Sequence, residues 1–359
     1  MSFCHLARFT NSSFDLGARS VGGDAACFII AEAGVNHDGD VSAAIDLVHA
    51  AADAGADAVK FQTFTAAALA TRSAKKAKYQ QATTDSAETH YEMLQRLELD
   101  GGQHVILQDI ARARGIEFLS SPFSEQAADM LNDLNVPAFK IPSGEITNID
   151  LLRHVGSFKR PVILSTGMAN LGEIRSAVEW LGPASNVDIV LLHCVSNYPA
   201  KPEDCNLRAM ETMSQEFGLP IGFSDHTLGA DVAIAAVALG ACVVEKHITL
   251  DTTRDGPDHA ASMAAHDFVE FVARIRSTES ALGHGRKEPV ASEAEVAAVA
   301  RRSLVAAMDI VPGTVIDGSM LIARREEAGM LPSERDRIVG RTAHIAIAAG
   351  TLLHPDMLR

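Results

Sequence analysis

A series of eight short apolar runs in the first 250 residues, separated by stretches with helical spacing, constrains the fold most strongly. Each run spans about 4–8 residues and is apolar almost throughout, which is typical of a parallel strand buried on both faces. The runs are 27–33, 58–64, 117–122, 138–143, 161–167, 189–196, 220–225 and 242–249. Eight strands that alternate with helices predict an α/β fold, a (β/α)8 TIM barrel of about 250 residues.

The main alternative is an open, doubly wound sheet, which would carry a glycine-rich GxGxxG turn after its first strand. No such turn follows residues 27–33, so the barrel is favoured. Helical spacing predicts helices over 42–54, 104–114, 124–134, 171–181 and 266–282. The connection 65–102 is too long for a plain strand–helix loop, and we expect part of it to lie over the strand ends as a substrate loop.

The pattern changes after Gly283. We assign 1–26 as an N-terminal extension, 27–284 as the barrel, 285–300 as a linker and 301–359 as a small β-rich domain. Turn residues in the last of these separate five short strand candidates at 303–307, 314–316, 321–323, 342–347 and 352–353.

Composition excludes several classes of function. The chain carries 31 Lys and Arg against 46 Asp and Glu, a net charge of −15, which is unsuited to general nucleic-acid binding. No apolar run reaches the roughly 18 residues that span a bilayer, and the N-terminal segment lacks the apolar core of a signal peptide. The 5 cysteines form no CxxC pair. We therefore expect a cytoplasmic protein with reduced cysteines and no membrane or nucleic-acid partner.

Polar side chains stand at the carboxyl end of every candidate strand, which is where TIM barrels place their active sites. They are Glu32 and Asn36; Lys60 and Gln62; Ser120 and Ser121; Lys140, Ser143 and Glu145; Ser165 and Thr166; His193, Ser196, Asn197 and Tyr198; Ser224, Asp225 and His226; and Glu245, Lys246 and His247. In a closed barrel these residues meet at one rim, so we expect the active site there.

Lys60 and Lys140 end apolar strands, and a buried lysine needs an anionic partner. One interpretation is an internal ion pair with Glu32 or Glu145. The other is a substrate site in which the lysines hold a phosphate and a carboxylate. Short hydroxyl donors that suit such a site are Ser121, Ser143, Ser165 and Ser224.

His226 and His247 stand at the ends of the seventh and eighth strands, which are neighbours in a closed barrel, so they can face one metal ion. Two imidazoles with water and substrate oxygens suit Mn²⁺, Fe²⁺ or Co²⁺, and Mg²⁺ less well. The alternative is a pair of hydrogen-bonded core histidines. Glu32 and Asp258 are candidates for acid–base work, although the sequence does not assign the proton.

Long motifs resemble the sialic acid synthase family, which includes the legionaminic and pseudaminic acid synthases. They include IAEAGVNHDGD, AVKFQTF, FLSSPFS, FKIPSGEITN, ILSTGM, LHCVSNYPA, GFSDHTLG and GPDHAAS, and the tail 301–359 resembles that family's antifreeze-like SAF domain. The resemblance implies condensation of phosphoenolpyruvate with the aldehyde of a 2-acetamido sugar such as N-acetylmannosamine, giving a nine-carbon 2-keto acid and phosphate. The alternative acceptor is a 2,4-diacetamido-trideoxyhexose, as in legionaminic or pseudaminic acid synthesis.

The resemblance also implies roles for residues. His226 and His247 would bind a divalent metal, typically Mn²⁺, with Mg²⁺ and Co²⁺ as alternatives. Phosphoenolpyruvate would be held by Lys60, Ser121, Lys140, Ser143, Ser165 and Ser224, with Ser196 where the sialic acid enzymes carry Asn and Tyr198 beside it. The sugar or the reacting carbons would be contacted by Glu32, Gln62, Glu145 and Asp258, of which Glu32 and Glu145 are the candidates for proton transfer.

The resemblance further implies a domain-swapped homodimer, in which an arginine of the SAF domain reaches the sugar in the partner's site. Arg325 best matches that arginine, although the usual Arg-Pro-Gly context is replaced by RREEAG. Two other functions remain open: an aldolase that forms a Schiff base on Lys60 or Lys140, and a polysaccharide-binding protein without catalytic activity.

Overall fold

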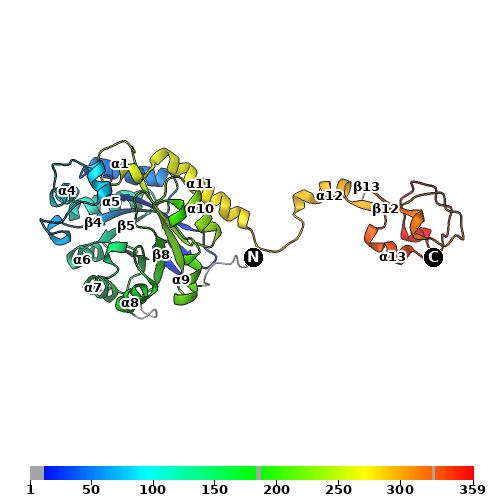
Figure 1. Cartoon of the computed structure of the whole chain (residues 1–359), viewed down its shortest axis with the longest axis horizontal. Helices are drawn as coiled ribbons and strands as arrows, with labels where there is room; N and C mark the ends of the chain where they lie inside the picture. The colour runs from blue at the N-terminus through cyan, green and yellow to red at the C-terminus, as the bar shows by residue number, and fades with distance from the viewer. Residues whose placement is uncertain (1–11, 183–186, 326–327) are drawn as a thin grey trace. The chain divides into compact units, whose positions relative to one another are not determined.

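The computed structural model describes residues 12–182, 187–325 and 328–359 (Figure 1). Its internal contacts divide the chain after Gly285 into two compact units. We describe each unit by itself.

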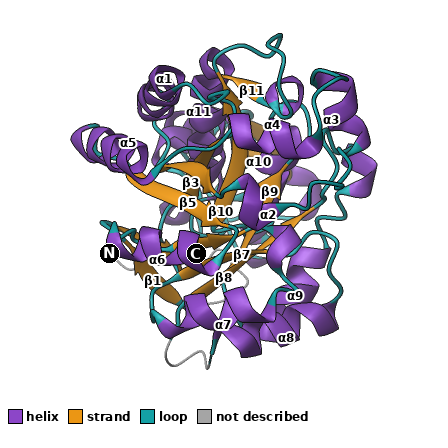
Figure 2. Cartoon of the chain, turned by 90° about the vertical axis from the view of Figure 1, so that its left-hand side faces the viewer, coloured by secondary structure: helices purple, strands orange, loops and turns teal. Residues whose placement is uncertain are grey.

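Eight parallel strands form the centre of the first unit, in the hydrogen-bonded order β5-β4-β3-β10-β9-β8-β7-β6. Their bounds are β3 (Phe28–Gly34), β4 (Ala58–Thr63), β5 (Glu117–Pro122), β6 (Phe139–Ile141), β7 (Val162–Ser165), β8 (Ile189–Cys194), β9 (Ile221–Asp225) and β10 (Val243–Thr249). A short strand, β11 (Met263–Ala264), pairs in parallel with the end of β10. Helices lie around these strands in Figure 2. The arrangement is a nearly closed TIM barrel, which confirms the predicted fold.

The helices of the barrel follow the strands in alternation. They are α1 (Val41–Asp53), α5 (Gly101–Ala113), α6 (Glu125–Asp133), α7 (Ile149–Ser157), α8 (Leu171–Leu181), α9 (Ala209–Phe217), α10 (Asp231–Ala238) and α11 (Ala265–Leu282), with 3-10 turns η1 (Ser143–Glu145), η2 (Pro202–Asp204) and η3 (His259–Ala261). Side chains of the residues before several helices accept from free amides of the first turn, as Asp40 does at α1 and Asn170 at α8. These caps fix where the strand–helix loops end, and the loops carry the polar rim.

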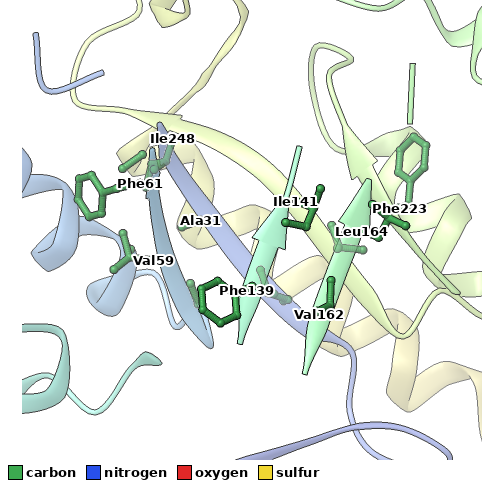
Figure 3. Close-up of a cluster of buried hydrophobic side chains, with 14 of the residues drawn as sticks. Ala31, Val59, Phe61, Phe139, Ile141, Val162, Leu164, Phe223 and Ile248 are labelled. Atoms are coloured by element: carbon green, nitrogen blue, oxygen red, sulfur yellow. The ribbon is translucent and has the colours of Figure 1, made fainter. Parts of the chain in front are cut away.

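Alternation along the strands sorts side chains into two layers. Ile29 and Ala31 of β3 point outward and pack with Val59 and Phe61 of β4 beneath the helices, as Figure 3 shows for several of these residues. Phe28 and Ile30 point inward and fill the barrel together with other inward side chains, among them Leu119, Ile163, Val190 and Val243. The next inward position on β3 is Glu32. The polar rim therefore lies directly above a packed apolar interior.

An antiparallel hairpin at the N-terminus, β1 (Ser13–Leu16) and β2 (Arg19–Gly22), was not predicted from the sequence. Leu16 and Val21 are fully buried against the inward-facing apolar cluster. Arg19 lies 3.0 Å from the carboxylate of Asp57, which precedes β4. The hairpin therefore packs at the end of the barrel opposite the polar rim.

The connection between β4 and α5 folds into three short helices, α2 (Ala66–Leu69), α3 (Lys78–Thr83) and α4 (His90–Arg96). Its apolar side chains form a separate buried cluster with Val35, Phe64 and Phe123 from the loops after β3, β4 and β5. The long connection therefore forms a layer of short helices above the ends of three neighbouring strands.

The second unit has its own apolar core, which includes Leu304, Ile316, Ile338 and Leu353. Its regular elements are η4 (Ala291–Glu293), α12 (Ala294–Ala300), β12 (Arg302–Ala306), η5 (Gly318–Met320), β13 (Leu321–Arg325), η6 (Pro332–Glu334), α13 (Arg335–Ile338) and η7 (Pro355–Met357). The strands β12 and β13 pair antiparallel. The other predicted strands appear as isolated bridges, such as Ile310 with Ile347 and Val315 with Thr342, because single backbone contacts replace continuous ladders there.

None of the helices in the described residues combines the length and apolar character needed to cross a membrane.

Burial of α1 against the barrel gives a test of the fold. Leu47 is 0% exposed and packs in the layer between strands and helices. Leu47→Ala should lower the free energy of unfolding of the barrel by about 2–5 kcal/mol, because it removes buried methyl groups and leaves a cavity. The matched control is Asp46→Ala on the exposed side of α1, which should change stability by about 0.5 kcal/mol or less. Urea denaturation followed by circular dichroism measures both; equal midpoints would contradict the packing.

Candidate active site

A cavity of about 350 Å³ opens at the carboxyl ends of the barrel strands. The predicted site residues that line it are Glu32, Lys60, Gln62, Ser121, Lys140, Ser143, Ser165, Ser196, Tyr198, Ser224, His226, His247 and Asp258. They come from nearly every strand or strand–helix loop around the barrel. The structure therefore brings together residues that lie more than 200 positions apart in the sequence.

Of the residues to which the resemblance gives a role, two lie outside the lining of this cavity. Glu145 is in the 3-10 turn after β6, where its carboxylate accepts a 2.7 Å hydrogen bond from the side-chain amide of Asn148. It follows Gly144, which does line the cavity. Arg325 is the exposed last residue of β13 in the second unit.

The floor of the cavity is a buried network of two lysines and two glutamates. The Nζ atom of Lys60 lies 2.5 Å from Oε2 of Glu32 and 3.7 Å from Oε2 of Glu245, and Nζ of Lys140 lies 3.5 Å from Oε1 of Glu245. None of the four side chains is more than 6% exposed. The ion pair between Lys60 and Glu32, one of the two interpretations of the sequence, is thus present. It does not exclude the other, because both lysines also line the cavity.

Serine hydroxyls complete the floor. Lys140 donates a 2.7 Å hydrogen bond to the hydroxyl of Ser165, and Lys60 donates a longer one, 3.3 Å, to Ser121. Ser224 donates to Glu245 at 3.0 Å. The amide of Gly167 donates to Ser143 at 3.0 Å. Small hydroxyl side chains leave room above the ammonium groups and can turn toward an incoming anion.

The two glutamates of the floor differ in charge state. Burial raises the pKa of Glu32 to about 7, against the opposing effect of Lys60. Burial also opposes ionisation of Glu245, but Lys140 and Lys60 outweigh it and lower the pKa of Glu245 to about 2. Near neutral pH the floor therefore holds one permanent carboxylate, and Glu32 is poised to give up or take up a proton. Burial lowers the pKa of Lys140, whereas at Lys60 the charges of Glu245 and Glu32 outweigh burial and raise the pKa.

The two histidines face the same cavity from adjacent strands. The ring centroids of His226 and His247 are 5.7 Å apart, and the ring of Tyr198 lies 4.2 Å from that of His226. Nδ1 of His226 donates to the backbone carbonyl of Val195 at 2.7 Å, which leaves a lone pair on Nε2. Burial lowers the pKa of both histidines, so both are neutral near pH 7.

Comparison with known proteins identifies the family. The model of the NeuB family matches residues 47–287. The chain belongs to the NeuB family. Residues 301–359 match the SAF domain, so the resemblance of the tail is also confirmed.

Several relatives of this NeuB-family chain are acid synthases by name. It is 47% identical over 341 residues to the N,N'-diacetyllegionaminic acid synthase of Legionella pneumophila, covering 94% of this chain and 96% of the relative. It is 44% identical to the synthase of the same name from Campylobacter jejuni, covering 88% and 95%. The crystal structure of N-acetylneuraminic acid synthetase from Leptospira borgpetersenii superposes with a TM-score of 0.70 at 34% identity, covering 81% of this chain and 96% of that one.

The donor set of this NeuB-family site fits a divalent metal ion with two protein ligands. No group of three or more His, Cys, Asp or Glu side chains suited to a metal occurs in the described ranges. Nδ1 of His247 is buried, has no hydrogen-bond partner among the described residues, and lies 4.0 Å from the carboxylate of Asp258. Two neutral imidazoles, one oriented by the carbonyl of Val195, are ligands for first-row transition ions when water and substrate complete the shell.

Two residues of the site received no role from the sequence. Glu245, named there only among the polar strand ends, bridges both lysines of the floor, and the signal for its role is the alternation that places it two residues before His247 on β10. Tyr79 of α3 stacks on Tyr198 with ring centroids 5.3 Å apart and lines the cavity. Burial, with the charge of Asp258, raises its pKa, so its hydroxyl stays neutral. Nothing in the sequence placed Tyr79 there, because the path of the long connection depends on tertiary packing.

Proposed function

We propose that this protein condenses phosphoenolpyruvate with the open-chain aldehyde of a 2,4-diacetamido-2,4,6-trideoxyhexose, giving a nine-carbon 2-keto acid of the legionaminic type and inorganic phosphate. The observation that carries this proposal is one cavity with a lysine and serine floor beneath two neutral imidazoles. Family membership and the names of the relatives support the same reaction class.

The floor supplies recognition of phosphoenolpyruvate. Lys60 and Lys140 would neutralise its phosphate and carboxylate, and the surrounding serine hydroxyls would donate the remaining hydrogen bonds. These hydroxyls belong to Ser121, Ser143, Ser165, Ser196 and Ser224. The ion pairs with Glu32 and Glu245 hold the lysines in place before the substrate arrives. The trianionic substrate would then bind to lysines and hydroxyls that are already in position, and its oxygens would take over some of the contacts within this network.

The reaction balances with one water molecule. The C3 carbon of phosphoenolpyruvate bonds to the aldehyde carbon, whose oxygen takes up a proton and becomes a hydroxyl. Water adds at C2 and loses a proton, the bond from C2 to the phosphate oxygen breaks, and a ketone and inorganic phosphate result. Glu32, with a pKa of about 7, is the floor carboxyl that can exchange a proton in these steps. Asp258 and Gln62 line the cavity beside it and would hold the sugar hydroxyls.

His226 and His247 would hold a divalent ion, for which Mn²⁺ is our first choice. When bound, such an ion polarises an aldehyde oxygen as a Lewis acid. The protein's own part is orientation: the carbonyl of Val195 fixes the tautomer of His226, and the adjacent, tilted ring of Tyr198 restricts its rotation.

Our choice of the acceptor sugar follows sequence identity to relatives whose names give their product. The relatives at 47% and 44% identity are named for N,N'-diacetyllegionaminic acid, whereas the N-acetylneuraminic acid synthetase is 34% identical. N-acetylmannosamine is therefore the second candidate acceptor.

We further propose that two chains form a homodimer in which Arg325 serves the partner's site. Arg325→Ala should then raise the KM for the sugar in kinetic assays and leave the KM for phosphoenolpyruvate unchanged; analytical ultracentrifugation showing only monomer would contradict the dimer.

A phosphate-release assay with Mn²⁺, phosphoenolpyruvate and a panel of sugars tests the reaction. The panel contains 2,4-diacetamido-2,4,6-trideoxymannose, its altro isomer for pseudaminic acid synthesis, and N-acetylmannosamine. We expect the fastest release with the first sugar, and mass spectrometry should show a nine-carbon keto acid. Failure of every sugar would overturn the proposal. Borohydride trapping of substrate on Lys60 or Lys140 would instead favour the Schiff-base aldolase.

A further inference from the structure

One side of the cavity is apolar, in contrast to its charged floor. Six side chains, which we call the apolar wall, contribute to it: Val35, Phe64, Met93, Leu94, Leu97 and Phe123. None of them was singled out by the sequence. They derive from three neighbouring strand ends and from the helix α4 that covers them.

The apolar wall lies one layer above the floor. Lys60 and Gln62 are inward positions of β4, and Phe64 is the next residue at the same spacing. Ser121 is an inward position of β5, and Phe123 continues that spacing. Because side chains two apart in a strand share a face, each phenylalanine follows its floor residue toward the mouth of the cavity.

The apolar wall is preformed. Phe64 and Phe123 meet edge to face with centroids 5.9 Å apart. Met93, Leu94 and Leu97 pack against each other and against Leu69 and Ala70 of the same connection. Thr89 and Glu92 cap α4 reciprocally, so the helix that presents these side chains is fixed at its start. No conformational change is needed to present this surface.

The chemistry of the wall determines what it can bind. Among the described residues lining the cavity, the only cations are Lys60 and Lys140, both at the floor, so a phosphate on the far end of the acceptor would find no partner here. Hydroxyl groups that lose water against these six side chains would also find no hydrogen-bond partner on them. Methyl groups are favoured there, because their transfer from water to an apolar surface is favourable.

We infer that the apolar wall is a subsite for the methyl groups at the far end of the acceptor, namely the C6 methyl of a 6-deoxy sugar and the acetyl methyl at C4. This inference rests on the proposed function, which places the aldehyde carbon near the floor and the histidines. The acceptor chain then runs from the floor toward the mouth, where the wall lies. Tyr79 and Gln80 border the same cavity and supply polar groups for the amide of the C4 substituent.

The experiment compares kcat/KM for 2,4-diacetamido-2,4,6-trideoxymannose with kcat/KM for N-acetylmannosamine. In the unmodified protein the ratio should be about 100 or more, the scale of discrimination that an apolar pocket provides for such groups. Met93→Gln places an amide of similar size in the wall, and the ratio should fall about tenfold or more. Met93→Leu, which keeps the wall apolar, should hold the ratio within about threefold of the starting value.

A control variant and a second variant of the apolar wall complete the experiment. Gln95→Ala alters an exposed residue of α4 and should leave both kcat/KM values unchanged. Met93 is 1% exposed, so Leu94→Asn, nearer the surface at 8%, serves as a second variant if Met93→Gln does not fold. A ratio that is unchanged in the folded polar variants, or near 1 in the unmodified protein, overturns the subsite while the synthase reaction stands. Absence of phosphate release with both sugars overturns the proposed function and the subsite together.

Discussion

Lys140→Met should lower kcat/KM for phosphoenolpyruvate by about 10³-fold or more. Methionine keeps most of the buried stem but removes the ammonium group, which lies 2.7 Å from the hydroxyl of Ser165 and lines the cavity. Loss of one preorganised donor to a developing or bound anion costs about 10²–10³ in rate, and here ground-state binding of the anion weakens as well. Steady-state kinetics with phosphate release measures the effect, and saturation with phosphoenolpyruvate should not restore the rate.

The same substitution should also destabilise the barrel. Glu245 keeps Lys60 at 3.7 Å but loses Lys140 at 3.5 Å, and breaking a buried pair costs about 3–5 kcal/mol. The double variant Lys140→Met with Glu245→Gln also removes the buried charge that has lost Lys140 as its partner, and it should recover much of the stability without recovering activity. A double variant that regains near-normal kcat/KM would show that Lys140 serves only the fold.

A matched control lies at the opposite end of the barrel. Arg276 donates to the buried carboxylate of Asp57 at 2.7 Å, near the N-terminal hairpin. Arg276→Met should lower the unfolding midpoint in urea, because Asp57 then keeps Arg19 as its one cationic partner among the described residues, beside the amide of Ile29. Activity per folded molecule should remain unchanged, since none of these residues lines the active-site cavity. Comparing this variant with Lys140→Met separates loss of a buried ion pair from loss of the anion site.

The strands and the polar rim were predictable because their signals are local. The runs before Glu32, Lys60 and Lys140 are apolar on both faces, which only a covered parallel strand requires. Closure of the barrel then brings every strand end to one rim, so residues far apart in the sequence could be assigned to one site. The N-terminal hairpin was missed because Leu16 and Val21 form too short a pattern to indicate pairing.

Other parts of the site depend on packing that the sequence does not display. Glu245 reads as one polar residue in an apolar strand, and its link to both lysines follows only from the registers of β10 with its neighbours. Met93 and Leu97 read as the core face of a helix, yet they also line the cavity. Glu145 was assigned to the site by motif; in the described structure its carboxylate accepts a hydrogen bond from the amide of Asn148, and its role at the site stays a prediction. In a turn after a strand, such as the one that carries Glu145, the spacing of residues in the sequence does not indicate which way a side chain points.

His226→Ala should abolish binding of Mn²⁺ and reduce turnover by about 10³-fold or more, the equivalent of several kcal/mol of lost charge stabilisation. With one imidazole removed, only His247 remains of the pair, and no further cluster of three candidate ligands in the described ranges can replace it. Isothermal titration with Mn²⁺ gives a readout that does not depend on turnover. We expect one binding event per chain in the unmodified protein and none in the variant, and EDTA should remove activity that added Mn²⁺ restores.

The control for this prediction is another strand-end histidine. His193 ends β8 as His226 follows β9, but its Nε2 contacts the carbonyl of Cys205 at 2.7 Å, and it lines a different pocket. His193→Asn should therefore bind Mn²⁺ with unchanged stoichiometry. If His226→Ala retained full binding and activity, or if EDTA-treated protein released phosphate at the normal rate, the two imidazoles would be structural and the Lewis-acid role would be wrong. If both variants lost binding equally, a general loss of folding would explain the effect, which near-ultraviolet circular dichroism would reveal. His226 and His193 differ in one respect that decides the expected result: of the two, only His226 has its ring beside that of His247 in the active-site cavity.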